Sequence, residues 1–448
     1  MPTDPFRTLL RTLEVVRPAF TRPGYCNLVL LLIGWVLVQG PHTVTGAVVA
    51  AGVAGVLHHE RFHRFFSRGT WDPDQVGRRL IAALVPRLRG LSLPVVIDDT
   101  LAQHTGPRIH GLGCHLDAVR STRGLKVFSF GHCWVVFCVA LPLPFSRRPW
   151  ALPVLFRLYR QEKDCLRARI PYKKKTELAR EMLDQVLAWF PTLRIDAMAD
   201  QAYCNSTLLT GLPDRVTWFG AMRPDAALTA SPAPRKPGQR GRSRKKGDRL
   251  PTPSALAQDP QVPWRTCAYK NHEQAYTARY KMLDAQWYSV GGMRLFRILV
   301  VKMETGTIPI RVYFASDVTL SVTAILSGAR CRWSIEVFFR DAKQWLGLAD
   351  SPARLEAAVL RVTPFVGLVY TMLVLWFVDA GLENDLELFP YRPWYPHKDQ
   401  VSFPDILRAA QCTLKPRRIF AELRRSGNLL KFPPPTKFPA QEPLREAS

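Results

Sequence analysis

Short apolar runs rich in β-branched residues alternate with one long helix-type segment between Leu91 and Tyr203, and this order restricts the fold more than any other feature. The runs LPVVIDDT, LKVFSFGHCWVVFCVALPLP and WALPVLFRLYR have the composition of strands. The segment KKKTELAREMLDQVLAWFP has helical spacing and is followed by a further apolar strand, RIDAMADQAY. Strands followed by a helix and another strand predict an α/β fold with a mixed sheet flanked by helices.

The first ninety residues carry mainly helix-type segments. They include RTLLRTLEVVRP, two apolar stretches, LHHERFHRFFSRGTW, and WDPDQVGRRLIAALVPRLRG behind an Asp cap. The stretch from His58 to Trp71 mixes cations with aromatic rings, which suits phosphate contact and base stacking. A basic helix that covers a core with its Phe residues explains the same stretch equally well. We expect a helical N-terminal region that binds DNA.

The interval from about Asn205 to Phe314 breaks this order. It contains SPAPRKPGQRGRSRKKGDRLPTPS, whose cations, Gly and Pro predict a flexible exposed loop, with Lys245 and Lys246 as candidate DNA contacts. The later pieces RTCAYKNHEQAYTARYKMLDAQWYSV and FRILVVKM resemble strands. The interval therefore predicts a β-rich insertion that interrupts the sheet.

Helical periodicity returns after the insertion and gives way to Pro clusters near the C-terminus, where we expect a partly disordered extension. The sequence thus divides into five expected parts. These are a helical N-terminal region (1–90), the first part of the sheet domain (91–204), the insertion (205–314), the second part of the sheet domain (315–385) and the C-terminal extension (386–448).

The charge balance indicates a polyanionic partner. The chain has 62 Lys plus Arg against 36 Asp plus Glu, a formal net charge of +26. Nucleic acid is the leading candidate, because neutralising phosphates releases counterions and gives strong, salt-sensitive binding. An anionic membrane surface is the alternative. The nine cysteines are scattered, without a CxxC pair, and the N-terminus lacks secretory-signal features, so we expect a cytoplasmic protein, in bacteria associated with the nucleoid.

Three apolar stretches test whether the chain crosses a membrane: Asn27–Val38, Val44–Leu57 and Val362–Val378. The first two are too short for a bilayer, and the third falls just short and contains Pro364. Buried core helices have the same appearance at this length, so we expect no membrane association. The nucleotide-binding pattern GxxxxGK[ST] is absent, and no nucleotide cofactor is expected.

Two acidic blocks end apolar strands. Asp98 and Asp99 are expected to close the first strand, and Asp200 to end the RIDAMAD strand. Carboxylates at the mouth of a buried strand are held rigidly where a hard metal ion can reach them. Either block alone is explained as well by acids that open a polar turn. Neighbouring side chains on a strand point to opposite faces, so only one of Asp98 and Asp99 can easily serve.

The third block, RCRWSIEVFFRDAK, concentrates its charge on one side of an apolar helix. Arg332, Glu336, Arg340 and Lys343 follow helical spacing and form a single stripe. A salt-bridge ladder within the helix would explain the stripe without a function. Together, the three acidic blocks suit phosphodiester cleavage with two metal ions, in which Arg332, Arg340 and Lys343 would bind DNA phosphates.

The blocks VVIDDT, AMADQAYCN and RCRWSIEVFFRDAKQWLGL, in this order, resemble the bacterial insertion-sequence DDE transposases, in the branch that has a β-rich insertion before the final Glu. The resemblance covers roughly residues 91–350 and implies an RNase H-like catalytic domain. It assigns metal binding and catalysis to Asp99, the acid before Thr, and to Asp200 and Glu336. The family's signature in the last helix matches Arg332, Glu336 and Lys343, but its Tyr is replaced here by Ala329.

The resemblance implies cut-and-paste DNA transposition. This activity comprises cleavage at the terminal inverted repeats of a mobile element and strand transfer into target DNA, with two Mg²⁺ ions, replaceable by Mn²⁺, and a homodimer on double-stranded DNA. In relatives a Trp of the insertion stacks a flipped base, for which Trp264 and Trp287 are candidates; either ring could equally be part of the core. The alternative is a catalytically inactive or non-enzymatic DNA-binding protein derived from a transposase.

Overall fold

The structure is a computed structural model, and its description covers most of the chain. The residues described are 4–88, 90, 92–106, 108–122, 124–235, 241–271, 274–302, 310–381, 398 and 400–414. They form two compact units: one is drawn from Met1–Gln75, Arg108–His110 and Gln344–Ser448, the other from Val76–Pro107 and Gly111–Lys343. The C-terminal tail that the sequence predicts to be disordered lies outside the described residues.

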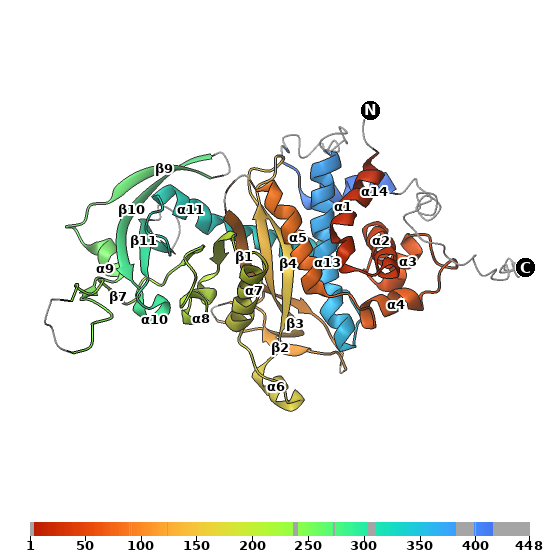
Figure 1. Ribbon diagram of the computed structural model, residues 1–448, viewed down its shortest axis with the longest axis horizontal. Helices are drawn as coiled ribbons and strands as arrows, with labels where there is room; N and C mark the ends of the chain where they lie inside the picture. The colour runs from red at the N-terminus through yellow and green to blue at the C-terminus, as the bar shows by residue number, and fades with distance from the viewer. Residues whose placement is uncertain are drawn as a thin grey trace, which may run out of the picture. The chain divides into compact units, whose positions relative to one another are not determined.

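The first unit is helical, and the predicted helical N-terminal region is present. A long helix, α13, has α1, α2, α4 and α14 packed around it (Figure 1). It is apolar on all sides, as expected for a helix in the centre of a core. The elements are α1 (Pro5–Leu13), η1 (Glu14–Ala19), α2 (Arg22–Leu37), α3 (Val44–Ala50), α4 (Glu60–Ser67), α13 (Glu356–Trp376), the π-helical turn η4 (Phe377–Gly381) and α14 (Phe403–Leu414).

Local sequence signals explain how this unit assembles. Thr21 caps α2 by accepting a hydrogen bond from the backbone N–H of Gly24 at 3.2 Å. Gly34 lets α2 approach α3 closely, because a Cβ at this position would lie 2.0 Å from the carbonyl oxygen of Ala47. The indole N–H of Trp35 donates to the carbonyl of Leu346 at 3.0 Å, which ties α2 to the C-terminal part of the unit.

The rings of the basic and aromatic stretch from His58 to Trp71 lie in this helical core. Phe62, Phe65, Phe66 and Trp71 are all buried. Phe65 and Trp71 stack on each other with centroids 5.1 Å apart, and Phe66 meets Phe365 of α13 edge-on. Of the two readings of this stretch, the structure favours rings that pack a core over rings available to bases.

The segment Glu356–Ala380 is, among the described residues, the one helix long and apolar enough to cross a membrane. Most of it is buried inside the first unit. A core helix of a soluble protein meets the same criterion, so this helix is weak evidence for a membrane span.

The second unit is built on one mixed sheet with helices against it. Its strands are β1 (Ser92–Gln103), β2 (Gly113–Leu116), β3 (Phe128–Leu141), β4 (Trp150–Tyr159), β5 (Arg194–Ala199), β6 (Val216–Ala221), β7 (Leu228–Thr229), β8 (Arg249–Leu250), β9 (Arg265–Asn271), β10 (Gln274–Gln286), β11 (Leu295–Lys302) and β12 (Ile310–Ala315). Its helices are α5 (Pro73–Leu84), η2 (Val85–Arg87), α6 (Glu162–Ala168), α7 (Lys175–Trp189), η3 (Gln201–Tyr203), α8 (Ser206–Leu209), α9 (Pro253–Gln258), α10 (Tyr288–Gly291), α11 (Val322–Cys331) and α12 (Trp333–Trp345).

Strands β4, β3, β1, β5 and β6 lie side by side in this order. β1 and β3 pair antiparallel, as do β3 and β4, whereas β5 pairs parallel with β1 and with β6. The return from β4 to a parallel strand beside β1 requires a crossover, which α7 provides. This arrangement confirms the mixed sheet flanked by helices and is the one expected of an RNase H-like domain.

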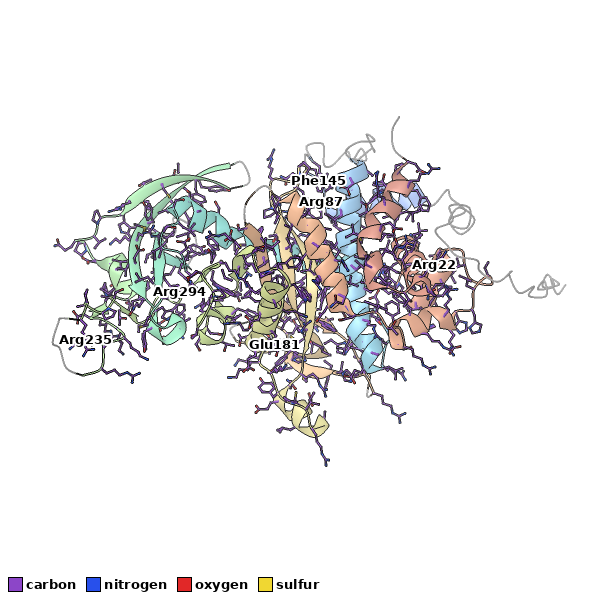
Figure 2. All side chains as sticks on the ribbon, in the orientation of Figure 1. Arg22, Arg87, Phe145, Glu181, Arg235 and Arg294 are labelled. Carbon is purple, nitrogen blue, oxygen red and sulfur yellow. The ribbon has the colours of Figure 1, made fainter. Side chains whose placement is uncertain are left out.

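The strands of the insertion continue this sheet. β12 pairs antiparallel with β6, and β11 and β10 extend the sheet beyond β12. The interval 205–314 holds the strands β6 to β11 and most of β12, and these strands share one hydrogen-bonded sheet with β1, β3 and β5. Figure 2 shows Arg235 on the loop between β7 and β8, the region predicted to be an exposed basic loop.

Candidate active site

The two acids of the first block lie inside β1. The expectation that they close the strand is wrong, because β1 continues to Gln103. Its last residues stay paired with the long strand β3, with Thr100 opposite Trp134 and Gln103 opposite Gly131. The neighbouring strand therefore extends β1 past the acids, a contact that the local sequence does not reveal.

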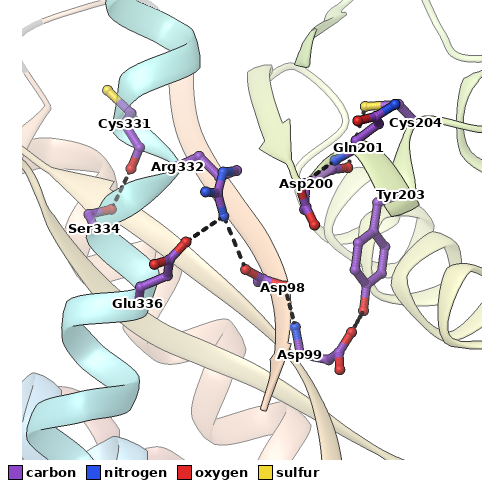
Figure 3. A network of polar contacts seen from close by, with 10 residues as sticks. All are labelled: Asp98, Asp99, Asp200, Gln201, Tyr203, Cys204, Cys331, Arg332, Ser334 and Glu336. Atoms are coloured by element: carbon purple, nitrogen blue, oxygen red, sulfur yellow. Dashed lines mark hydrogen bonds and ion pairs between the residues drawn. The ribbon is translucent and has the colours of Figure 1, made fainter. Parts of the chain in front are cut away.

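Asp98 and Asp99 point to opposite faces of the sheet, as the alternation of a strand requires (Figure 3). Asp98 faces Arg332, whose Nη1 lies 3.4 Å from Asp98 Oδ2. Asp99 faces the side on which α7 packs, where Lys175 Nζ lies 2.5 Å from Asp99 Oδ2 and Tyr203 donates its hydroxyl to Oδ1 at 2.8 Å. The two neighbouring carboxylates thus belong to different environments.

Asp200 follows β5 directly and caps the short helix η3, accepting a hydrogen bond from Gln201 N–H at 2.6 Å. The parallel pairing of β1 with β5 runs up to Ile97 opposite Ala199. The next residues in register are Asp98 and Asp200, and partners in a parallel ladder share a face. Figure 3 shows Asp200 in the same region as Asp98, and its charge acts on that acid.

The helical stripe is interrupted. α11 ends at Cys331 and α12 begins at Trp333, so Arg332 lies in the break between two helices rather than within one. Ser334 donates its hydroxyl to the carbonyl of Cys331 at 2.7 Å, which satisfies an acceptor at this break. The i,i+4 relation nevertheless persists, because Arg332 Nη1 lies 2.8 Å from Glu336 Oε1.

One guanidinium therefore joins two of the acidic blocks. Arg332 contacts Glu336 on α12 and Asp98 on β1 (Figure 3). Asp200, which follows β5, is close enough to Asp98 for its charge to act on that acid. The structure brings acids from all three blocks to one face of the sheet, although they are far apart in sequence. The member of the first block on this face is Asp98.

The rest of the stripe behaves differently. Arg340 directs its guanidinium to Asp341, with hydrogen bonds of 3.0 Å from Nε and 2.8 Å from Nη2 to the same oxygen. Asp341 is buried, so this contact compensates a carboxylate inside the fold. Lys343 lies exposed near the end of α12.

The pKa shifts on the two faces of β1 have different causes. Burial raises the pKa of Asp98 to about 7; the nearby charges of Asp99 and Asp200 add to the rise, while the Asp99 backbone N–H and Arg332 oppose it. On the other face, burial raises the pKa of the Cys133 thiol to about 12, and Asp99 contributes to this rise. Burial alone would lower the pKa of Lys175, but Cys133 and Asp99 outweigh it and the net shift is upward.

The sequence analysis does not predict the cluster that surrounds Asp99. This cluster consists of Lys175, Tyr203 and Cys133. The local signals are that the lysine lies at the start of a predicted helix and that the tyrosine belongs to the second acidic block. Neither spacing relates these residues to Asp99, which is remote in sequence. The crossover helix α7 and the turn η3 bring them together.

The candidate tryptophans lie in or beside the core of the insertion strands. Trp287 is buried, 9% exposed, and meets Phe314 edge-on with ring centroids 5.6 Å apart. Trp264 is half-buried, with Lys281 Nζ 4.9 Å from its ring centroid. In this conformation Trp287 offers no open ring face to a base. Of the two loop lysines, both exposed, Lys246 lies with its Nζ 5.6 Å from the ring centroid of Tyr288.

The acids do not form a closed ligand set. Within the described ranges, no group of three or more His, Cys, Asp or Glu side chains is positioned to hold a metal ion. On the Asp98 face, Arg332 contacts two of the three acids and provides a positive charge there.

Comparison with known proteins gives the family of the chain. The sequence profile described as DDE superfamily endonuclease matches residues 16–289, more than half of the chain. The chain therefore belongs to the DDE superfamily of endonucleases. The match includes the first two acidic blocks and ends before Glu336.

Other comparisons are less informative. No curated protein matches the sequence. The piggyBac transposase in its synaptic complex with hairpin DNA has 8% identity and a TM-score of 0.40, over 93% of this chain and 78% of that chain.

Proposed function

We propose that this endonuclease is a DNA transposase, which cuts at the ends of a mobile element and joins them to target DNA. The observation that carries the proposal is the convergence of Asp98, Asp200 and Glu336 around Arg332, in a chain with a net charge of +26. Cut-and-paste transfer, terminal inverted repeats and a homodimer on double-stranded DNA are the finer parts of the proposal and follow from the family resemblance.

The acids on the Asp98 face fit a divalent metal site by their chemistry. Carboxylate oxygens are the ligands that Mg²⁺ prefers, and Mg²⁺ keeps several waters and takes further oxygens from phosphates. We assign the ligands to Asp98, Asp200 and Glu336, with Mn²⁺ as a substitute ion. Asp99, which the resemblance names instead of Asp98, faces Lys175 and Tyr203. When bound, the ions would supply an activated nucleophile and stabilise the leaving oxygen.

The residues of the chain have separate roles in this proposal. Arg332 pairs with Asp98 and Glu336 in the free protein and, when those carboxylates take other ligands, can turn its guanidinium to a DNA phosphate. Lys343 and the loop lysines Lys245 and Lys246 provide exposed charges for the DNA backbone.

Asp99 is a positioning residue in this proposal. Its carboxylate accepts a hydrogen bond from the hydroxyl of Tyr203, which lies in the turn capped by Asp200. The same carboxylate is paired with Lys175, the first residue of α7. These contacts fix the turn after β5 to β1, and thereby hold Asp200 beside Asp98.

The test is cleavage of a plasmid that carries the DNA flanking the coding region, in Mg²⁺ or Mn²⁺. Glu336→Gln and Asp98→Asn are expected to abolish strand cleavage. The matched controls Glu181→Gln and Asp184→Asn change surface carboxylates of α7 and should cleave like the wild type. Undiminished cleavage by both site variants would show that these acids are not catalytic.

The alternative is an inactive or non-enzymatic DNA-binding protein. Both proposals require steep salt dependence of DNA binding, because many phosphates would be neutralised. Only the transposase proposal requires metal-dependent cleavage. Salt-dependent binding by the wild type without cleavage in either metal would favour the alternative.

A further inference from the structure

The hairpin formed by β2 and β3 exposes large apolar side chains. Buried apolar residues are the rule elsewhere in this unit, so a cluster of exposed ones needs an explanation. The exposed fractions are 49% for Leu116, 91% for Val119, 62% for Leu125, 60% for Phe128 and 58% for Phe130.

The two phenylalanines lie on the face of the sheet that carries Asp98. Asp98 is opposite Val136 on β3, and Phe128 and Phe130 alternate in step with Val136 along the same strand. Leu116 is opposite Phe128 and extends the same apolar face onto β2. At roughly 3.3 Å per residue, Phe130 lies about 20 Å along the strand from the position opposite Asp98.

The polar side chains of the hairpin leave it positively charged. Asp117 is the one acid between Thr105 and Phe128 in the sequence, and it is buried. Its carboxylate accepts hydrogen bonds from Gln103 at 2.8 Å, Ser129 at 3.2 Å and the backbone N–H groups of Val119 and Arg120 at 3.2 Å. Arg120 and Lys126, in the connection between β2 and β3, are exposed.

Charge decides which partner suits this surface. A second copy of the chain would bring another +26 charges and no complementary acid on its own hairpin. A DNA strand with unstacked bases offers flat rings for the phenylalanines and phosphates for Arg120 and Lys126. Paired bases in an intact duplex do not expose their faces, so the partner is a single-stranded or opened segment.

We infer that Phe128 and Phe130, at the exposed end of β3, stack on unpaired bases of a DNA strand whose cleavage site is held at the catalytic acids. The inference rests on the proposed function, because it requires the DNA to be opened at the cleavage site. It adds a single-strand contact on β3 that is separate from the acids and from the basic loop.

Binding of fluorescein-labelled oligothymidine in EDTA tests the inference without cleavage. The matched probes are an abasic oligonucleotide of the same length, which keeps the phosphates, and a duplex of the same length. The wild type should bind oligothymidine more tightly than the abasic strand. The double variant Phe128→Ala/Phe130→Ala should lose about 5- to 150-fold in affinity for oligothymidine, the effect of losing one stacked base, with little change for the abasic strand and the duplex.

Leu166→Ala is the control, because Leu166 is an apolar side chain of comparable exposure, 72%, that belongs to α6 and to neither β2 nor β3. It should bind all three probes like the wild type. Lys126→Ala should weaken binding to oligothymidine and to the abasic strand alike and reduce the salt dependence of both.

The outcomes separate this inference from the proposed function. If the double variant binds oligothymidine like the wild type, stacking on the hairpin is refuted and the proposed function is untouched. If light scattering shows that the double variant dissociates a wild-type dimer, the face is a self-association surface and the inference is also refuted. A wild type that binds none of the three probes would contradict the proposed function itself.

Discussion

The neighbouring acids of β1 give the most discriminating prediction, because their substitution should separate stability from activity. Asp99→Asn keeps an acceptor for Tyr203 but removes the negative charge that compensates Lys175. Asp98→Asn removes a largely buried charge. Among the described residues the cation paired with Asp98 is Arg332, which is 3.4 Å away and also paired with Glu336. We expect the first change to affect mainly folding and the second mainly cleavage.

The magnitudes follow from burial and pairing. The side chains of Lys175 and Asp99 are 34% and 24% exposed, so water screens part of their attraction. Breaking a fully buried pair costs about 3–5 kcal/mol, and we reduce this to about 1–3 kcal/mol for Asp99→Asn because of the exposure. For Asp98→Asn we expect a change within about 1 kcal/mol, because a neutral amide costs less to bury than a charge.

Urea denaturation and plasmid cleavage, measured on the same preparations, test both expectations. Asp98→Asn should denature near the wild-type midpoint and fail to cleave, whereas Asp99→Asn should denature earlier and cleave at temperatures where it is folded. Asp184→Asn provides the surface control. The opposite result would refute the assignment of Asp98 as the metal ligand. In that case Asp98→Asn cleaves, whereas Asp99→Asn has wild-type stability and does not cleave, and Asp99 is the ligand.

Three further predictions concern packing and electrostatics. Gly34→Ala should destabilise the protein by about 1–3 kcal/mol in thermal denaturation, because the added Cβ would clash with the backbone carbonyl of Ala47. Gly90→Ala is the control and should have little effect, because a Cβ at position 90 has no atom within 4 Å. Burial tends to raise the pKa of Asp405, but its hydrogen bonds with Lys398 and Ser402 outweigh burial and the net shift is downward. The ionised Asp405 therefore stabilises the fold fully above the pKa of the unfolded state, and this stabilisation is lost as the pH falls through the folded-state pKa. Asp405→Asn should reduce the pH dependence of unfolding in that range. Tyr203→Phe should cost about 1 kcal/mol by removing the hydroxyl that Asp99 accepts, and an unchanged midpoint would contradict that contact.

Much of the fold was predictable because its signals are local. The apolar spacing of α7 and the apolar runs of β1 and β5 are recorded in neighbouring residues. The error at the end of β1 has a tertiary cause. Two acids and a threonine look like a turn, but pairing with β3 keeps the strand extended past them.

Alternation along a strand predicts from sequence alone that only one of Asp98 and Asp99 can easily join a given site. It does not say which one, and the helical spacing of Arg332 and Glu336 does not indicate which strand they meet. The parallel register of β1 with β5 decides this, by bringing Asp98 level with Asp200, and Arg332 then joins them to α12. Hydrogen bonds between strands that are distant in sequence set that register. The local sequence therefore identifies the candidate acids, and the tertiary structure decides which side chains they contact.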